Sequence, residues 1–420
     1  MESGIRASRL RPGEPLPPVR ALARRLSVSP TTVAAAYRDL QARGFIVASG
    51  RRGTLVRPAP PPMAWTPPVP AGVRDLTTGN PDPELLPDLR PALLRIAPGR
   101  RLYGEPANHA PLLELAAERF RADGLPAHHL AVVGGALDGI DRILATSLRP
   151  GDRVGVEDPG YPELWDMVRA LGLVLEPLPV DARGPMPEGL DRALPRLAAV
   201  IVTPRGQNPT GAALDPERAA ELRHVLTRTP RVLVVEDDHS GNVAGAEAAT
   251  VTGAHLERWA IVRSASKSLG PDLRLAVVTG DALTVAKLED RQRLGTGWVS
   301  HILQRTVVEL AVDPEVRRLV KIAAERYAER RRAVVEALSA HGIEVSARSG
   351  LNVWVPVRDE AVTVRRLLQA GWAVAAGERF RHRAGPGVRI SIGNLAPAEA
   401  EPLARVLAER AVLAPRTRSA

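Results

Sequence analysis

A run rich in proline divides this chain of 420 residues into two parts. Residues 57–70 read RPAPPPMAWTPPVP, with seven prolines in fourteen positions. This segment cannot form a helix interior or a central strand, because proline lacks the amide donor and has a fixed backbone angle. We therefore expect a stiff linker over 58–72, a small N-terminal domain over 1–57 and a large domain over 73–415.

The positive charge is concentrated in the small domain. The whole chain has a net charge of +10, and residues 1–58 hold eleven arginines against three acidic residues. An arginine-rich proteome would raise the charge everywhere, so it does not explain this concentration. A basic module in front of a nearly neutral body indicates nucleic-acid binding.

The composition also excludes several classes of protein. The chain has no cysteine, which rules out disulfides, thiolate zinc sites and cysteine nucleophiles. No apolar run approaches the ~20 residues of a membrane span, and the N-terminus lacks the apolar core of a signal peptide. We expect a cytoplasmic protein without a membrane segment or a metal site.

The small domain has the pattern of a winged helix-turn-helix. Residues 19–26 have helical apolar spacing, and residues 31–40 form a second helix with Ser29 as N-cap and Pro30 at its first position. Residues 45–47 and 53–56 fit a β-hairpin wing. With the second helix in the major groove, the predicted DNA contacts are Ser29, Thr31, Thr32 and Arg38, with Arg51 and Arg52 on the wing.

The large domain alternates short β-branched runs with amphipathic stretches. This alternation predicts an α/β fold with a mostly parallel sheet covered on both faces, followed from about residue 296 by helices and a smaller α+β end. The predicted strands are 130–133, 154–156, 200–203, 232–236, 260–263, 275–279, 351–357 and 388–392. The predicted helices are 137–148, 162–171, 216–226 and 325–338.

Polar groups follow several of these strands, at the edge where such sheets bind ligands. Gly135 and Ala136 open a helix whose amides can approach a phosphate, although a Gly-Gly pair is more often a simple turn. Tyr161 lies in a Pro/Gly turn, where we favour stacking on a planar ring over a core role. Asn208 belongs to an Asn-Pro-Thr-Gly string and can donate to a phenolic oxygen.

Three acidic residues in a row, Glu236 to Asp238, follow Val235 at the end of the predicted strand 232–236, and His239 comes next. Alternation lets only part of the group face the site, and we choose Asp237, with His239 on the same side. A carboxylate there can bond a pyridinium nitrogen. Arg389, on a late strand, suits a carboxylate ligand, although it is one arginine among 54.

Lys267 is one of only three lysines, and it lies in the string SASKSLGPDLR. Surface cations in this chain are almost all arginine, so a lysine among small hydroxyl residues indicates chemistry that a guanidinium cannot do. An amine can form a Schiff base with an aldehyde, and the pKa of lysine can be lowered enough to allow it.

The N-terminal phrase LPPVRALA…SPTTVAAAYRDLQARGF resembles the winged helix of GntR-type regulators. That family has a longer first helix before RLRPGEPLP, so we expect either a truncated first helix here or a start that lies upstream.

Residues 76–407 resemble class I/II aminotransferases of fold type I, which use pyridoxal 5'-phosphate (PLP). The order Tyr161, Asn208, Asp237, Lys267 and the strings TGNPDPELLPDL and Leu102-Tyr103-Gly104 carry this resemblance. Together with the winged helix, the chain resembles the MocR subgroup of GntR regulators. The EDDH, SASKSLGPDLRLAV and GWVSHILQ strings resemble the members that control vitamin B6 salvage.

The resemblance implies a role for each matching residue, with Lys267 and Asp237 as the catalytic pair. A histidine at 239 departs from the family's usual tyrosine, and its charge would depend on pH. The implied set is Gly135, Ala136, Ser264, Ser266 and Arg274 on the phosphate, Tyr161 on the ring, Asp237 on the ring nitrogen, Asn208 and His239 at the phenolic oxygen, Arg389 on the effector carboxylate and Tyr103 across a dimer.

The leading hypothesis is a transcription regulator that binds operator DNA as a head-to-tail homodimer. PLP on Lys267, or an amino compound that displaces the lysine, would shift the body between two arrangements. One alternative is an active aminotransferase with a vestigial DNA-binding arm. Another is a scaffold that has lost PLP and acts only as a dimer.

Overall fold

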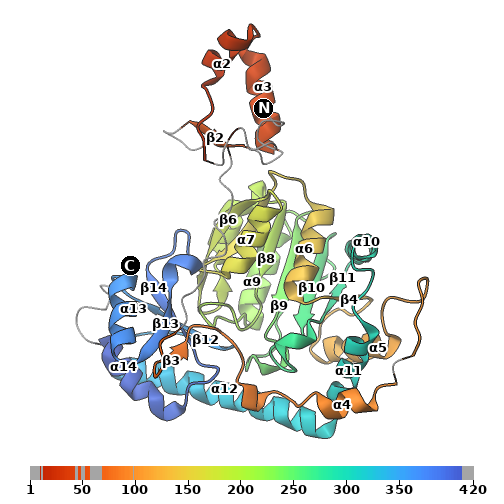
Figure 1. The fold of residues 1–420 in the computed structure, drawn as a ribbon, viewed down its shortest axis with the longest axis vertical. Coiled ribbons are helices and arrows are strands. Elements are labelled where there is room, and N and C mark those ends of the chain that lie inside the picture. Colours follow the sequence, from red (N-terminus) through yellow and green to blue (C-terminus); the bar gives the residue numbers. More distant parts are fainter. Residues whose placement is uncertain are drawn as a thin grey trace. The chain divides into compact units, whose positions relative to one another are not determined.

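A computed structural model describes residues 10, 13–42, 46–48, 53–56, 69–97 and 99–408 (Figure 1). The expected linker lies outside these residues except for 69–72. The N-terminal unit and the body are described separately below. In the described part of the chain, no helix is both long and apolar enough to cross a membrane.

The N-terminal unit contains the predicted helix-turn-helix, α2 (Val19–Leu26) and α3 (Pro30–Ala42). The hydroxyl of Ser29 accepts a hydrogen bond of 3.0 Å from the amide of Thr32, so Ser29 does cap α3. The strands β1 (Ile46–Ala48) and β2 (Thr54–Val56) pair antiparallel as the wing.

The chain in front of α2 completes this small sheet. The Leu16 amide donates to the Thr54 carbonyl, and the Val56 amide donates to the Glu14 carbonyl, each at 2.8 Å. A small apolar core holds the helices on the sheet, built from Leu16, Leu22, Ala23, Val33, Tyr37, Leu40, Ile46 and Val56. The winged helix therefore has a core of its own.

The body is built on an eight-stranded sheet in the order β4-β11-β10-β9-β8-β5-β6-β7. β11 runs antiparallel to both of its neighbours, while β8, β9 and β10 pair parallel. Consequently β4, β8, β9 and β10 all point the same way. The strands are β4 (His129–Val133), β5 (Arg153–Asp158), β6 (Val174–Asp181), β7 (Gly184–Pro185), β8 (Ala199–Val202), β9 (Leu233–Asp238), β10 (Trp259–Ser264) and β11 (Ala276–Gly280).

Helices cover both faces of this sheet. A Cβ on Gly139 of α6 would lie within 3.4 Å of Val133, Val262 and Val278, so α6 packs on the face that those valines share. Val277 and Arg263 point to the other face, toward α5. The helices of this part are α4 (Arg90–Arg95), α5 (Ala110–Ala122), α6 (Ala136–Ser147), α7 (Pro162–Ala170), α8 (Pro187–Ala193), α9 (Pro216–Leu226), α10 (Ala282–Arg293) and α11 (His301–Val312).

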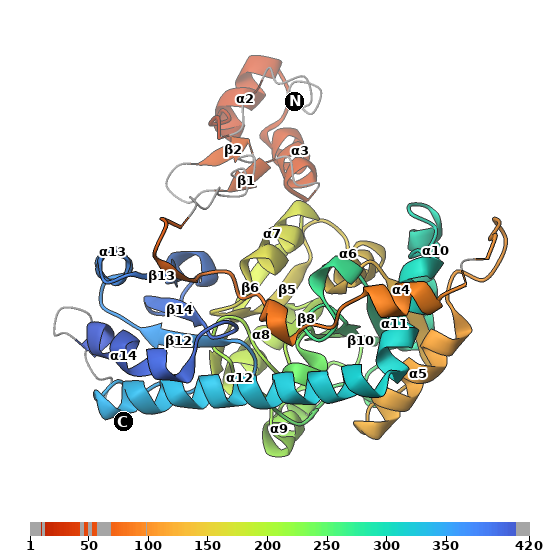
Figure 2. The same ribbon diagram turned by 60° about the horizontal axis from the view of Figure 1, so that its bottom comes forward.

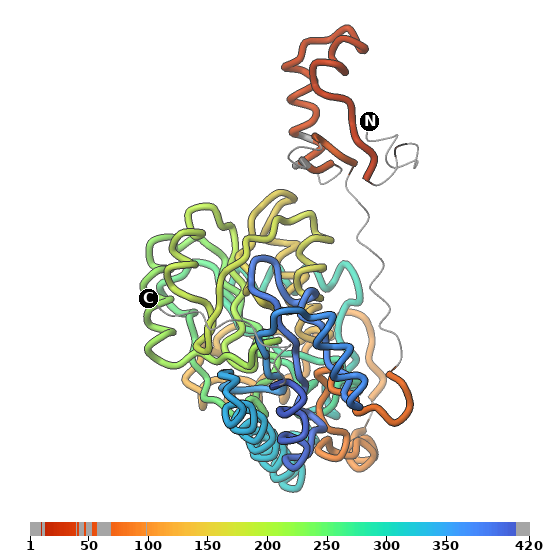
Figure 3. The backbone as a smooth tube through the Cα atoms, turned by 90° about the vertical axis from the view of Figure 1, so that its left-hand side faces the viewer, coloured from red at the N-terminus to blue at the C-terminus, as the bar shows by residue number. Residues whose placement is uncertain are grey.

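The smaller α+β part is a second sheet, in the order β12-β14-β13-β3, with helices packed against it. Its first strand, β3, comes from the start of the body and pairs parallel with β13 near the C-terminus (Figure 3). The elements are β3 (Arg74–Leu76), β12 (Asn352–Pro356), α13 (Glu360–Gln369), β13 (Trp372–Ala376), β14 (Gly387–Ser391) and α14 (Ala400–Ala408).

One helix of 27 residues, α12 (Pro314–Ala340), connects the two parts of the body (Figure 2). Val316 and Val320, near its start, pack on the core of the large sheet. Tyr327, Val334 and Leu338, further along, are buried in the core of the small sheet. The predicted fold class is confirmed: an α/β body with a smaller α+β part follows a winged helix.

Candidate functional site

The predicted site residues lie mainly at the ends of β9 and β10 and in the turns that follow. Lys267 follows β10, and its amine donates a hydrogen bond of 2.8 Å to the carbonyl of Gly79. Burial lowers the pKa of this amine to about 8, helped by the nearby guanidinium of Arg389, while the carboxylate of Asp237 opposes the shift. Roughly a tenth of the amine is then unprotonated at pH 7.

Asp237 lies at the end of β9 and is only 5% exposed. Its Oδ1 atom is buried and accepts no hydrogen bond from any residue that the structure describes. Its Oδ2 atom lies 3.5 Å from Nδ1 of His239. Burial opposes the charged form of that imidazole, but the carboxylate of Asp237, with a smaller contribution from Asp238, raises the pKa of His239 above its usual value.

The two carboxyl groups beside Asp237 belong to other networks. Glu236 accepts hydrogen bonds from the amides of Val251 and Thr252, and burial raises its pKa to about 7. Asp238 takes both Arg205 and Arg263 as ion-pair partners, at 2.8 and 2.7 Å. The three neighbours thus point to different places, and of the three only Asp237 has a buried oxygen atom without a hydrogen-bond partner among the described residues.

Gly135 and Arg274 meet at the start of α6. Gly135 has φ +108°, and a Cβ there would lie 3.0 Å from Nη2 of Arg274. The same guanidinium donates to the Gly134 carbonyl at 3.3 Å, while the Gly134 amide donates to Asp138. Ala136 is the first residue of α6. The start of α6 thus brings a glycine of positive φ together with an exposed arginine, and both features suit a phosphate site.

Ser264 and Ser266 lie in the lysine turn, with their hydroxyl oxygens 2.9 Å apart. The resemblance assigns both hydroxyls, with Arg274, to a phosphate. They come from the same chain segment as Lys267, so one turn presents an amine and two hydroxyl groups.

Arg389 reaches the site from the second sheet, on β14. It is 5% exposed, and it donates to the amide oxygen of Asn208 at 3.1 Å and to the Thr77 carbonyl. Its guanidinium lies 4.6 Å from the ring centre of Phe380. Arg389, Asn208 and the segment before Gly79 thus lie together, although they are far apart in sequence.

The two tyrosines of the prediction differ in their placement. Tyr161 is half-buried where β5 gives way to α7. Tyr103 is 93% exposed and touches Trp298 edge-on, with the ring centres 5.5 Å apart. Within one chain, the structure does not bring Tyr103 to Lys267.

The predicted DNA contacts are placed in part. Thr31, Thr32 and Arg38 lie exposed on α3, while Arg51 and Arg52 lie outside the described residues. The Ser29 hydroxyl is within 2.7 Å of the hydroxyls of Thr31 and Thr32, so it already caps the helix.

Sequence reasoning missed the buried carboxyl group of Glu157 near Asp237. Glu157 accepts hydrogen bonds from the Thr203 amide at 2.8 Å and from Gln207 at 3.1 Å. Burial raises its pKa to about 7. The signal available was an acid at the end of a buried strand, the same signal that picked out Asp237.

The observed groups fit PLP. A buried amine of lowered pKa can condense with an aldehyde, and the unbonded Oδ1 of Asp237 can accept a hydrogen bond from a protonated pyridine nitrogen. The first amides of α6, together with the guanidinium of Arg274, can hold a phosphate.

Comparison with known proteins identifies the families to which the two parts of the chain are similar. Residues 71–407 match the family model for aminotransferase class I and II, and residues 1–56 match the gntR family of bacterial regulatory proteins. The chain is 41% identical to the vitamin B6 salvage pathway transcriptional repressor PtsJ of Salmonella typhimurium, over 95% of this chain and 94% of that protein. It is also 30% identical to an aspartate/prephenate aminotransferase of Thermus thermophilus, over 73% of this chain and 83% of the other.

Solved structures share the fold of the body. An aspartate aminotransferase of Thermus thermophilus superposes with a TM-score of 0.69 at 25% identity, covering 82% of this chain and 99% of its own. A kynurenine aminotransferase of Pyrococcus horikoshii gives a TM-score of 0.72 at 22% identity, over 80% and 90% of the two chains. The chain belongs to the MocR subgroup of GntR-type transcription regulators, in which a winged helix is joined to an aminotransferase class I and II domain.

Proposed function

We propose that this regulator binds PLP on Lys267 and controls transcription in response to PLP or to a small amino compound. The observation that carries the proposal is the pairing of a buried amine with a buried, unbonded carboxylate oxygen at Asp237. When bound, PLP supplies an aldehyde for the lysine and an electron-withdrawing ring.

Each neighbouring residue then has one task. Asp237 holds the ring nitrogen, and His239 or Asn208 donates to the phenolic oxygen. Ser264, Ser266, Arg274 and the amides of Gly135 and Ala136 hold the phosphate, and Tyr161 covers the ring. Arg389 remains for the carboxylate of an amino-acid effector, once its bond to Asn208 is exchanged.

The winged helix is the proposed DNA-binding element. α3 enters the major groove with Thr31 and Thr32 toward the bases and Arg38 toward a phosphate, and Arg51 and Arg52 reach a phosphate or the minor groove. Since its target is genomic DNA, we expect the protein in the cytoplasm. The name of the Salmonella relative supports vitamin B6 salvage as the process under control.

We propose a head-to-tail homodimer as the working unit. Four large side chains near one end of the body are more than two-thirds exposed: Leu94 (87%), Leu102 (72%), Tyr103 (93%) and Leu294 (81%). Three of them lie on or just after α4, which packs against α11 (Figure 1). Exposed apolar groups gathered in this way favour a second copy as partner, with Tyr103 reaching that copy's site.

The test is a gel-shift titration of the DNA upstream of the chain's own gene, with and without PLP. We expect PLP to change the DNA affinity of the wild-type chain by at least about fivefold, and to leave Lys267→Ala unchanged. A Lys267→Ala variant that responds to PLP like the wild type would contradict the proposal.

Aminotransferase activity is the second candidate, because the chain keeps Lys267, Asp237 and Arg389, the residues that the resemblance to aminotransferases assigns to PLP and to a carboxylate. Turnover of an amino acid with a keto acid, measured on the full chain, separates the two. Turnover without any retention of DNA would favour the enzyme, and DNA retention with no turnover would favour the regulator.

A further inference from the structure

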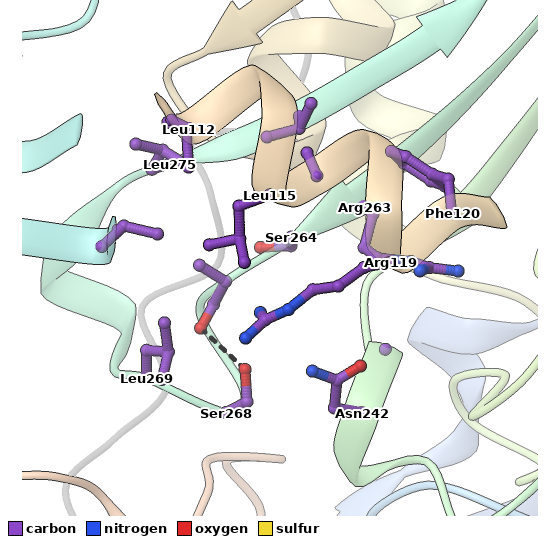
Figure 4. Close-up of a pocket in the computed structure, with 15 residues that line it drawn as sticks. Leu112, Leu115, Arg119, Phe120, Asn242, Arg263, Ser264, Ser268, Leu269 and Leu275 are labelled. Carbon is purple, nitrogen blue, oxygen red and sulfur yellow. Dashed lines mark hydrogen bonds between the residues drawn. The ribbon is translucent and has the colours of Figure 1, made fainter. Parts of the chain in front are cut away.

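The lysine turn also borders a cavity on the face of the sheet that carries α5. Its volume is about 60 Å³, room for about four waters or a small ligand. Figure 4 shows Leu112 and Leu275 together at one end and Asn242 at the other. The buried apolar part of its lining is Leu112, Ala116, Phe120, Leu269, Leu275, Val277 and Val307.

Two guanidinium groups border this apolar space. Arg263 forms ion pairs with Asp238 at 2.7 Å and with Asp123 at 2.9 Å, while its Nη2 atom is buried without a hydrogen bond to any described residue. Arg119 donates to the Ala311 carbonyl at 3.2 Å and has no carboxylate within ion-pair distance among the residues that the structure describes. Burial, with Arg317 and Arg263 nearby, lowers the pKa of Arg119.

A cation without a counter-charge beside an apolar cavity favours an anionic ligand with a short apolar tail. Asn242 and Ser268 add polar groups to the lining. Among the described residues, the Ser268 hydroxyl makes one long hydrogen bond, of 3.4 Å, to the Ala265 carbonyl. We propose that this cavity is a second ligand site, and that it binds a small aliphatic carboxylate through Arg119.

The placement of the cavity connects it to the PLP site. Ser264, Ala265, Ser268 and Leu269, which flank Lys267, form one wall. Arg263 forms part of another and pairs with Asp238, the neighbour of Asp237. A carboxylate bound by Arg119 would therefore be linked to Lys267 through the lysine turn and to Asp237 through the Arg263–Asp238 pair. This coupling rests on the proposed function, whereas binding in the cavity does not.

Binding is tested with carbon-13 labelled butyrate, titrated into the full chain and followed by NMR. We expect Arg119→Gln to weaken the affinity roughly tenfold or more, the value of a charge-assisted hydrogen bond. Leu115→Trp should fill the cavity and abolish binding. Arg121→Gln, two residues along the same helix but exposed, is the matched control and should bind as the wild type does.

Arg389 is the other place where a carboxylate could bind, so the titration is repeated on Arg389→Gln. If Arg389→Gln still binds butyrate and the double variant Arg389→Gln/Arg119→Gln does not, the cavity is supported as the binding site. Butyrate binding that survives both Arg119→Gln and Leu115→Trp, or that Arg389→Gln alone removes, overturns it.

The coupling is tested on the PLP-loaded chain by its absorbance. Butyrate should shift the cofactor band in the wild type but not in Arg119→Gln. Butyrate binding without a shift of the cofactor band would overturn the coupling but not the second ligand site.

Discussion

Lys267 and Asp237 are unusual at the level of single residues because each is buried and keeps bonding capacity that its neighbours do not use. The amine donates only to a carbonyl among the described residues, and one oxygen of the carboxylate has no bond. A buried polar atom left unbonded costs about 1–3 kcal/mol, which a ligand can recover. The site therefore favours a bound ring with a basic nitrogen.

Asp237→Asn tests this argument. The amide cannot supply the charge that holds a protonated ring nitrogen, so PLP affinity should fall roughly 10- to 100-fold. Absorbance titration of PLP measures the loss. Asp290→Asn, which alters an exposed acid paired with Arg293, is the control. Equal affinity in the wild type and Asp237→Asn would remove Asp237 from the site.

His239 gives the chain a pH-dependent stability. Its folded pKa is raised above the unfolded value, so the protonated form stabilises the fold. That contribution is complete below the unfolded pKa of about 6.5 and is lost as pH rises through the folded pKa. The difference in unfolding free energy between the wild type and His239→Gln should thus be largest in acid. A difference that grows toward pH 9 would be inconsistent with this sign.

At the scale of elements, the start of α6 carries a specific backbone requirement. Gly135→Ala introduces a strained φ and a Cβ against Arg274, and we expect a loss of about 1–3 kcal/mol in unfolding free energy together with weaker PLP binding. Gly371→Ala has a similar φ of +89° but no atom within 4 Å of its Cβ. It should lose stability without losing PLP affinity. Equal PLP affinity in both variants would argue against a phosphate at α6.

The α3 helix makes a second element-scale prediction. Arg38→Gln should weaken binding to all DNA sequences alike and reduce the salt dependence by about one phosphate contact. Fluorescence anisotropy at several salt concentrations measures both effects. Arg228→Gln, on the surface of the body, is the control. An unchanged salt dependence in Arg38→Gln would place α3 away from the phosphates.

Some elements could be predicted closely from the sequence and others could not. The helix predicted at 216–226 has the same bounds as α9, because Asp215 caps it and Pro216 starts it. The strand β6 was missed because Pro177 and Pro179 interrupt its pattern. The sheet tolerates these prolines because β6 lies next to its last strand. The short strand β3 was missed because three residues carry no clear period.

At the scale of the whole molecule, the site depends on contacts that no local pattern encodes. The order of residues along the chain placed Asp237 and Lys267 on neighbouring strand ends, because parallel strands end at one edge. The contacts of Lys267 with Gly79 and of Arg389 with Thr77 join distant segments. They form only when the start of the body folds against both the lysine turn and β14.

The assignment of DNA binding to the winged helix and of PLP binding to the body is also testable. The winged helix and the body have separate apolar cores, so residues 73–420 should fold and bind PLP with wild-type affinity while losing DNA retention. Gel shift and PLP absorbance on the shortened chain measure both. DNA retention by residues 73–420 would contradict the assignment.

The most direct measurement is borohydride reduction of the PLP-soaked protein, followed by peptide mass spectrometry. The account predicts a single reduced PLP adduct on Lys267 in the wild type, and none on Lys267→Ala. A colourless protein without any adduct, or an adduct on Lys287 or Lys321 with Lys267 unmodified, would contradict it.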